Sequence, residues 1–397
     1  MTLVLNPDPR SRPERVMNGP KYREGIQKFS AALADTMPGV LQIKLCGKAG
    51  NPVARDFGGE LAGRFSEQLH VLQSWNQVVP PAGCVFRQLR QVSLGHDRWG
   101  GYHLPRIDPA TLVRLAVHNW PLGRSWAPFS ADDKAGEIEF PSLRTLCIFY
   151  RGADTEHPDT RVWQLRFPAL KIMRLYSPRE VCPLLQHAVL PAHMDAVSIR
   201  VTGACVRLMS SSALPAVGRF RIHILDNDTG LEVLDAVNRI SVRMRPREEA
   251  TLDVNSIPSS GIPALASLTK LVVRAPTGVD TMLALIQALP GLTGMIVWHL
   301  ALDNIQADIS VPGPAEARVV EPLGTRIEAM TLSVGRQPGM RRGKLAAVVK
   351  HLLLRIPTLR SLVAAQVPAE PIAYFVSAFV GRYPHLAAVN LRVGQGL

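Results

Sequence analysis

Cations and aromatic residues recur beside short apolar segments of this sequence, and these residues are the best suited to binding chemistry. An apolar pair two residues apart lies on one face of a strand, so the residues beside the pair lie on the other face. Guanidinium groups suit carboxylates and phosphates because they donate two parallel hydrogen bonds. Aromatic side chains supply anchors that dominate many interfaces. The predicted partner-binding residues are Arg174, Tyr176, Arg200, Arg221, His223, Arg243, Arg274 and Trp298.

The charge balance agrees with an acidic partner and leaves alternatives open. The 397 residues carry 45 Lys and Arg against 32 Asp and Glu, a formal net charge of +13. This indicates an acidic or phosphorylated protein, nucleic acid or another polyanion, or only a compositional bias toward Arg. We favour a protein partner, because only 6% of residues are aromatic and the basic–aromatic interleaving of single-strand binders is not apparent. A sheet face neutralised by neighbouring acids is the alternative to any binding patch.

Sequence motifs give no indication of an enzyme. The segment GMRRGKL from Gly339 resembles a phosphate-binding loop, but Pro338 replaces its first glycine and Leu345 replaces the Ser or Thr after Lys344. The 5 cysteines are odd in number and form neither a CxxC motif nor a zinc-spaced cluster with histidine. We therefore expect a non-enzymatic protein with no catalytic residues, no cofactor and no metal.

Hydropathy indicates an intracellular protein, cytoplasmic or nuclear, without a membrane partner. The best apolar run, PIAYFVSAFVG from Pro371, is shorter than the ~20 residues of a membrane span. The residues after Met1 lack the order of basic start, apolar stretch and cleavage site found in signal peptides.

A repeated motif predicts the elements that position the cations. FPSLRTLCIF from Phe140 and FPALKIMRLY from Phe167 align without a gap, 27 residues apart. Both fit φxxφxφ, where φ is apolar: the last two φ lie on one face of a strand and the first lies in the preceding turn. The pattern recurs at Val40-Ile43-Leu45, Leu89-Val92-Leu94, Leu112-Leu115-Val117, Leu143-Leu146-Ile148, Leu170-Met173-Leu175, Met194-Val197-Ile199, Val217-Phe220-Ile222, Val237-Ile240-Val242, Leu268-Leu271-Val273, Leu292-Met295-Val297, Ile327-Met330-Leu332, Leu359-Leu362-Ala364 and Leu386-Val389-Leu391.

Helical patterns lie between many of these predicted strands. Proline follows several of them and sets an extended entry to the next strand. Strands joined by such crossovers are parallel, and each unit must stack on its neighbours to bury its apolar face. The expected helices begin near Tyr22, Ser177, Val279, Lys344 and Glu370. The anchors expected to be buried are Leu146, Ile148, Met173, Leu175, Val197, Ile199, Phe220, Ile222, Leu271, Val273, Val389 and Leu391.

The pattern resembles that of leucine-rich repeats, whose unit reads LxxLxLxxN/C, with the irregular helical units of the ribonuclease-inhibitor-like and F-box-associated class. The resemblance covers roughly Val40 to Leu391, although the ninth position holds residues such as Trp120 and Arg151 rather than Asn or Cys. It implies an α/β curved solenoid, with a parallel sheet on the concave side and helices on the convex side. It also implies a protein–protein recognition scaffold, such as the substrate receptor of a ubiquitin ligase, although no F-box is visible.

We expect residues 1–397 to form a single irregular repeat solenoid. Clear repeats span about 40–391, and 1–39 form a partial N-terminal repeat. Loop insertions are expected at about 120–139, 151–164 and 301–326.

Overall fold

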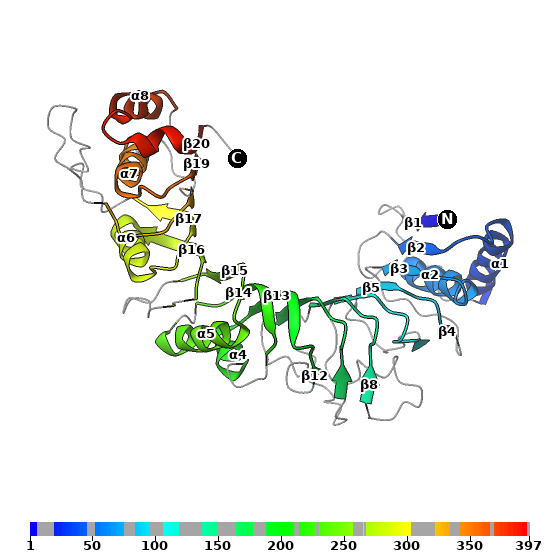
Figure 1. Ribbon diagram of the computed structural model, residues 1–397. Coiled ribbons are helices and arrows are strands. Elements are labelled where there is room, and N and C mark those ends of the chain that lie inside the picture. Colours follow the sequence, from blue (N-terminus) through cyan, green and yellow to red (C-terminus); the bar gives the residue numbers. More distant parts are fainter. Residues whose placement is uncertain are drawn as a thin grey trace. The chain divides into compact units, whose positions relative to one another are not determined.

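A computed structural model of the chain shows a mixed α/β protein (Figure 1). Among the described residues, helices and strands alternate before Ser74 and along most of the chain after Val201, whereas only strands are described between Val71 and Val201. The structure describes residues 1–5, 20–45, 52–74, 84–95, 106–118, 137–149, 164–177, 188–209, 214–227, 230–256, 265, 267–302, 322–333, 341–365 and 369–394.

A large parallel sheet dominates the described part of the chain and contains 15 strands. Its strands follow one another in sequence order, and the sheet does not close on itself. The backbone contacts divide the chain into two compact units, which we describe separately. Unit 1 comprises Met1–Val201 and Ser212–Ala216, and unit 2 comprises Thr202–Ser211 and Val217–Leu397.

Unit 1 contributes strands that pair in parallel from β1 to β13. Short strands outside the main sheet pair as β4–β6 and as β8–β10–β12. Two long helices, α1 (Pro20–Thr36) and α2 (Pro52–Arg64), belong to this unit. Its strands are β1 (Thr2–Leu5), β2 (Gln42–Leu45), β3 (Val71–Ser74), β4 (Val85–Phe86), β5 (Gln91–Gly95), β6 (Arg106–Ile107), β7 (Arg114–His118), β8 (Glu137–Glu139), β9 (Thr145–Phe149), β10 (Gln164–Arg166), β11 (Ile172–Ser177), β12 (Ala188–Val189) and β13 (His193–Val201).

The Phe-Pro repeat builds the same turn twice in unit 1. The amide of Leu143 donates to the carbonyl of Phe140, and the amide of Leu170 donates to the carbonyl of Phe167, each at 3.3 Å. The two phenylalanine rings are fully buried and stack with their centroids 5.1 Å apart. The duplicated sequence therefore stacks one turn on the next and continues the core between neighbouring strands.

Unit 2 pairs its strands in parallel from β14 to β20. Among its described elements, the helices alternate with strands along most of the sequence. The helical elements are α4 (Gly203–Met209), α5 (Leu231–Met244), α6 (Val279–Ala288), α7 (Arg341–Arg355), α8 (Ala369–Phe379) and the 3-10 helix η2 (Pro384–Ala388). The strands are β14 (Ala216–Ile224), β15 (Glu249–Val254), β16 (Lys270–Gly278), β17 (Gly294–Ala301), β18 (Ala329–Leu332), β19 (Ser361–Ala365) and β20 (Asn390–Gly394).

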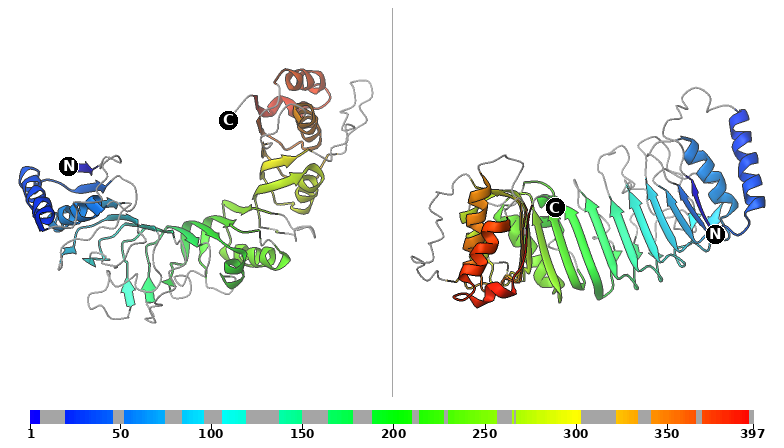
Figure 2. Two further views of the ribbon diagram at one scale, coloured as in Figure 1. Left: turned by 180° about the vertical axis from the view of Figure 1, so that it is seen from behind. Right: turned by 90° about the horizontal axis from the view of Figure 1, so that it is seen from above.

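Within each unit, the described helices lie against one face of the sheet, and the strands are open to view on the other (Figure 2). Packing agrees in unit 1: a Cβ added to Gly58 of α2 would clash with the Cδ1 of the buried Leu45 on β2. In unit 2, the stripe Val233, Val237, Ile240 and Met244 of α5 is buried. We call the helix-covered face the core face and the opposite one the open face.

Ten of the twelve anchors expected to be buried are so, from Leu146 through Val273. The exceptions are Val389 and Leu391, which are only partly buried. Leu391 lies on β20, which pairs with β19 alone among the described strands. It therefore has neighbouring side chains on only one side of the sheet row.

One predicted strand is wrong. Val237-Ile240-Val242 lies within α5, where Val242 is 56% exposed. The first two anchors are three residues apart, a spacing that a buried helical stripe shares. The strand of this repeat is β15, whose preceding turn carries the exposed Arg247 where the motif has an apolar residue. Strand β3 also lacks the full motif, because Ser74 takes the third anchor position.

The other predicted elements fare unequally. Helices were expected near Tyr22, Val279, Lys344 and Glu370, and α1, α6, α7 and α8 confirm them. The helix expected to follow its N-cap Ser177 cannot extend as far as predicted, since Ala188–Val189 form β12. Ser177 itself ends β11, and 178–187, where the helix would begin, lie outside the described residues. Most of the three predicted insertions also falls outside them. The single continuous solenoid stays a prediction.

Candidate functional site

The open face of unit 1 carries a row of rings at the ends of neighbouring strands. Parallel pairing places His118 of β7 opposite Phe149 of β9, and Phe149 opposite Tyr176 of β11. The next register partner is Arg200 of β13. We call His118, Phe149 and Tyr176 the aromatic row. Its members are partly exposed, whereas the alternating residues of their strands form the core.

The aromatic row is held by ring contacts. His118 and Phe149 stack nearly parallel, with centroids 4.4 Å apart and an interplanar angle of 5°. Phe149 and Tyr176 are tilted, with centroids 6.4 Å apart. The guanidinium carbon of Arg200 lies 5.1 Å from the centroid of Tyr176, a distance typical of a cation–π contact. His118 and Phe149 therefore stack face to face, and the rings of the row remain partly exposed.

Cations on this part of the open face have no acidic neighbours in the sheet. Arg174 and Arg200 are exposed, and neither forms an ion pair with an acid among the described residues. Neither aspartate nor glutamate occupies an open-face position in the paired segments of β7, β9, β11 and β13. These positions are Arg114, Ala116, His118, Thr145, Cys147, Phe149, Ile172, Arg174, Tyr176, Ala196, Ser198 and Arg200.

Two titratable groups of this face have pKa values shifted from their ordinary values. Burial lowers the pKa of His118, so the imidazole of the aromatic row is neutral near pH 7. Burial raises the pKa of the Cys147 thiol, although the charges of Arg174 and Arg114 oppose the shift. The permanent positive charge of this face therefore comes from its arginines.

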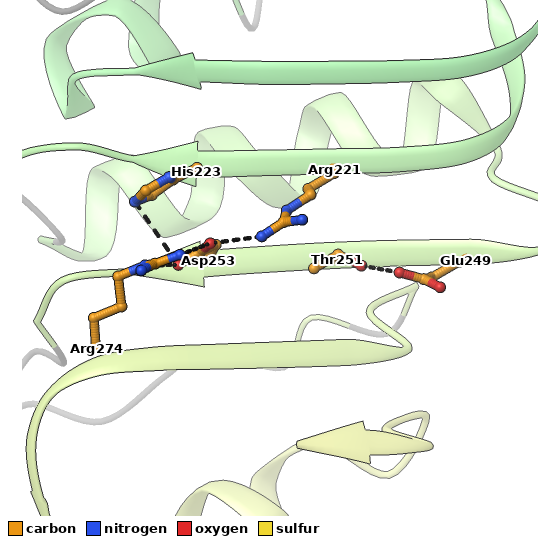
Figure 3. Close-up of polar contacts among 6 residues, drawn as sticks. All are labelled: Arg221, His223, Glu249, Thr251, Asp253 and Arg274. Atoms are coloured by element: carbon orange, nitrogen blue, oxygen red, sulfur yellow. Dashed lines mark hydrogen bonds and ion pairs between the residues drawn. The ribbon is translucent and has the colours of Figure 1, made fainter. Parts of the chain in front are cut away.

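Unit 2 places a buried carboxylate among the predicted cations (Figure 3). Asp253 of β15 is fully buried and accepts hydrogen bonds from Nε and Nη2 of Arg274, at 2.8 and 2.9 Å. Nη2 of Arg221 donates to the same carboxylate at 2.9 Å. Nε2 of His223 lies 3.8 Å from Oδ1 of Asp253. We call these four residues the Asp253 cluster.

Sheet register explains the Asp253 cluster. Asp253 pairs with His223 on β14, and Arg221 lies two residues before His223 on the same face. Arg274 follows the paired segment of β16 and reaches back to the carboxylate. Strand β15 thus places Asp253 between the cations of its two neighbours, β14 and β16.

Electrostatics of the Asp253 cluster favour the ionised carboxylate. Burial acts to raise the pKa of Asp253, but hydrogen bonds from Arg274 and Arg221, together with the charges of His223 and Arg274, hold it below its ordinary value. The hydrogen bond to Asp253 raises the pKa of Arg274. The guanidiniums stay partly accessible, with side-chain exposures of 52% for Arg221 and 39% for Arg274. Arg274 also lies 5.9 Å from the centroid of the Trp298 ring.

The predicted site residues thus fall into two groups. Arg174, Tyr176 and Arg200 lie together on unit 1, and Arg221, His223, Arg274 and Trp298 lie on unit 2. Arg243 is a correction: it lies in the last turn of α5 and not on a strand, because the anchors that placed it are helical.

Two important residues were missed by the sequence analysis. Asp253 was missed because β15 was not recognised; the alternation of Ala250, Leu252 and Val254 around it was the available signal. His118 was missed although it follows Val117 as Phe149 follows Ile148.

The described residues contain no cluster of three or more His, Cys, Asp or Glu side chains arranged to hold a metal ion. None of the helices described here is both long enough and apolar enough to cross a membrane. A comparison with protein-family models finds no family that matches the chain, and a comparison with curated proteins finds no similar one. The resemblance to leucine-rich repeats and the ubiquitin-ligase role that it implies therefore stay predictions.

Proposed function

We propose that this chain is a non-enzymatic recognition protein, and that the open face of unit 1 binds an acidic or phosphorylated segment of a protein partner. The observation that carries the proposal is the position of Arg174 and Arg200 on paired strand segments whose open-face positions hold no acid, beside the aromatic row. Guanidiniums without acidic neighbours keep their donors for a ligand, and the ring edges offer an apolar contact.

Several groups must act together in such a complex. A single exposed ion pair contributes at most about 1 kcal/mol. An apolar side chain packed against the edges of Phe149 and Tyr176 would exclude water around the arginines and strengthen their charge-assisted bonds. The partner segment that fits best therefore combines acidic groups with at least one apolar residue.

Nucleic acid is the second candidate, suggested by the net charge of +13. Single-strand binders stack bases on free ring faces. Here His118 covers one face of Phe149 at 4.4 Å, and Tyr176, itself beneath the guanidinium of Arg200, lies on the other side. Because a face of Phe149 and a face of Tyr176 are already covered within the protein, the ring arrangement favours a protein segment over a nucleic acid.

The repeat architecture belongs to the same proposal. We propose that the parallel sheet lines the concave side of a curved, leucine-rich-repeat-like solenoid, with helices on the convex side. The sequential strand order and the duplicated Phe140 and Phe167 turns support a repeat array. Small-angle X-ray scattering of the full chain tests it, because a curved array and two independently tumbling units give different distance distributions.

Charge reversal tests the binding surface. The probes are a synthetic peptide of alternating glutamate and leucine and a single-stranded oligothymidylate, each titrated into the full chain at several salt concentrations. We expect the double variant Arg174→Glu/Arg200→Glu to weaken peptide binding at least tenfold at low ionic strength, since attraction becomes repulsion. Circular dichroism should show an unchanged fold, because both side chains are exposed.

Arg382→Glu/Arg392→Glu supplies the matched control, because both residues are exposed and belong to unit 2. It makes the same change in net charge outside the proposed surface and should leave peptide affinity within about twofold. Equal peptide affinity of Arg174→Glu/Arg200→Glu and the parent chain would rule out this surface. Tighter binding of the oligonucleotide, with a steep salt dependence of the multi-phosphate kind, would favour the nucleic-acid alternative.

A further inference from the structure

Four residues on two neighbouring strands of unit 1 form a compact block of hydrogen-bond donors. Arg174 of β11 pairs in register with Ser198 of β13, and Tyr176 pairs with Arg200 two residues further along. All four lie on the open face, because the residues between them, Met173, Leu175, Val197 and Ile199, are buried. We call Arg174, Tyr176, Ser198 and Arg200 the donor block.

The contact between Arg200 and Tyr176 brings the guanidinium of Arg200 closer to the strand that carries Arg174. It draws the guanidinium of Arg200 from its own strand toward β11, to 5.1 Å from the ring centroid of Tyr176. Arg174 lies on that same strand, two residues or roughly 7 Å from Tyr176 along the backbone. Two long guanidinium side chains can therefore reach one group placed between them, above the Ser198 hydroxyl.

The chemistry of the donor block selects among anions. Each guanidinium offers five N–H donors and no acceptor, and the Ser198 and Tyr176 hydroxyls can each donate one more. A carboxylate has two oxygens and a single charge, whereas a phosphate monoester has three terminal oxygens and a charge of about −1.5 to −2 at pH 7. Two guanidiniums with a hydroxyl between them match the monoester in charge and in the number of acceptors.

The exposure of the donor block indicates that the ligand residue carries its phosphate on a short side chain. Arg174 and Arg200 are exposed and Tyr176 and Ser198 are only partly buried, so the block is a shallow surface. A phosphoserine holds its phosphate close to the peptide backbone. The neighbouring residues of the same segment would then lie near Phe149 and His118, whose ring edges continue from Tyr176.

We propose that the donor block is a phosphoserine-binding site, and that the partner segment places an apolar residue on the aromatic row beside it. This inference rests on the proposed function and specifies the ligand of the same face. Phosphorylation of the partner would then switch binding on, because serine supplies no charge and aspartate supplies too few oxygens.

Three matched peptides test the proposal with the full chain. They share one sequence, with glycines and a leucine two residues from the centre, and carry phosphoserine, aspartate or serine at the centre. Isothermal titration calorimetry at low ionic strength should show the phosphoserine peptide binding at least tenfold tighter than the aspartate peptide, and no measurable binding of the serine peptide.

Lysine substitutions separate geometry from charge. Arg174→Lys and Arg200→Lys keep the charge but lose the planar fork, so each should weaken phosphoserine binding about tenfold and change aspartate binding less than about twofold. Ser198→Ala should weaken binding of the phosphoserine peptide about threefold. The control is Arg144→Lys, because Arg144 is exposed in the turn before β9 and outside the donor block. It should leave all three peptides unaffected.

The outcomes distinguish this inference from the proposed function. Equal binding of the phosphoserine and aspartate peptides, both lost in Arg174→Glu/Arg200→Glu, overturns the phosphoserine site and retains the acidic-segment surface. Phosphoserine binding that survives both lysine variants and the double reversal overturns the donor block as the site. If neither the phosphoserine peptide nor the aspartate peptide binds, the inference is overturned as well. Titration of the glutamate–leucine peptide then tests the acidic-segment surface separately.

Discussion

The open faces of the two units share a sequence pattern and differ in chemistry. Each presents arginines and an aromatic residue beside buried strand anchors: Arg200 and Tyr176 in unit 1, Arg274 and Trp298 in unit 2. In unit 2 the strand β15 adds one buried carboxylate, Asp253, which holds two of the arginines. No acid occupies the corresponding paired positions of β7, β9, β11 and β13 in unit 1.

This difference shows what an array of cations means physically. A guanidinium that donates two hydrogen bonds to a buried carboxylate is held in place by the folded structure. Separating the pair would leave the buried carboxylate without a counter-charge. A guanidinium over a tyrosine ring is only lightly held, because a cation–π contact at an exposed site is worth about 0.5–1 kcal/mol. The contacts of the Asp253 cluster therefore indicate a structural role, and the binding role that we propose concerns only the arginines of unit 1.

The largest expected effect comes from removing the carboxylate of unit 2. Asp253→Asn keeps the shape of the side chain and leaves Arg221 and Arg274 without their counter-charge. We expect a loss of about 3 kcal/mol in unfolding free energy, the low end for a broken buried pair, because both guanidiniums can still reach water. Amide hydrogen exchange of β14 and β15, followed by mass spectrometry, should report the loss locally.

Arg200→Ala in unit 1 is the comparison for that substitution. Because Arg200 is exposed and pairs with no described acid, we expect the unfolding free energy to fall by less than about 1 kcal/mol. Equal losses for Asp253→Asn and Arg200→Ala would remove the distinction between a structural and a binding set of cations.

Acid should affect unit 2 through the same carboxylate. The pKa of Asp253 in the folded chain is lower than its ordinary value, which is about 3.9 in an unfolded chain. Its contribution to stability is therefore present above about pH 4 and is lost as pH falls through the lowered pKa. Between pH 6 and pH 2, the stability of the parent chain should fall toward that of Asp253→Asn. A difference that stays constant down to pH 2 would contradict this assignment.

An added acid should make unit 1 resemble unit 2. Ser198→Asp places a carboxylate on β13, opposite Arg174 and two residues before Arg200. Because it would bond to one or both guanidiniums, we expect the phosphoserine peptide to bind at least tenfold more weakly, with a change in stability below about 1 kcal/mol. Calorimetric titration measures the first effect and thermal denaturation the second. Ser198→Asn is the uncharged control and should weaken binding much less.

The sequence predicted the parallel strands better than it predicted the site. Apolar spacing located β9 and β11 because burial of Leu146, Ile148, Met173 and Leu175 imposes it. The same spacing failed at Val237–Val242, since three-residue intervals also suit a helical stripe. That error concealed β15 and with it Asp253, so the sequence left open whether acids neutralise the cations of unit 2 and did not locate the acid that does. Contacts such as Arg274 with Asp253 depend on strand register, which periodicity within one segment does not determine.

The smallest expected effect concerns the two aromatic neighbours of the arginines. Tyr176→Leu removes the main described contact of Arg200, whereas Trp298→Leu leaves Arg274 bonded twice to Asp253. We expect the Nε–H group of Arg200 to become more mobile in the first variant and that of Arg274 to change little in the second. NMR relaxation of arginine 15Nε signals measures both. Although each substitution costs only about 0.5–1 kcal/mol, Tyr176→Leu should also weaken phosphoserine binding a few-fold, because Arg200 would no longer be held near Arg174. If Arg274 loosens as much as Arg200 does, the carboxylate is not what fixes the cations of unit 2.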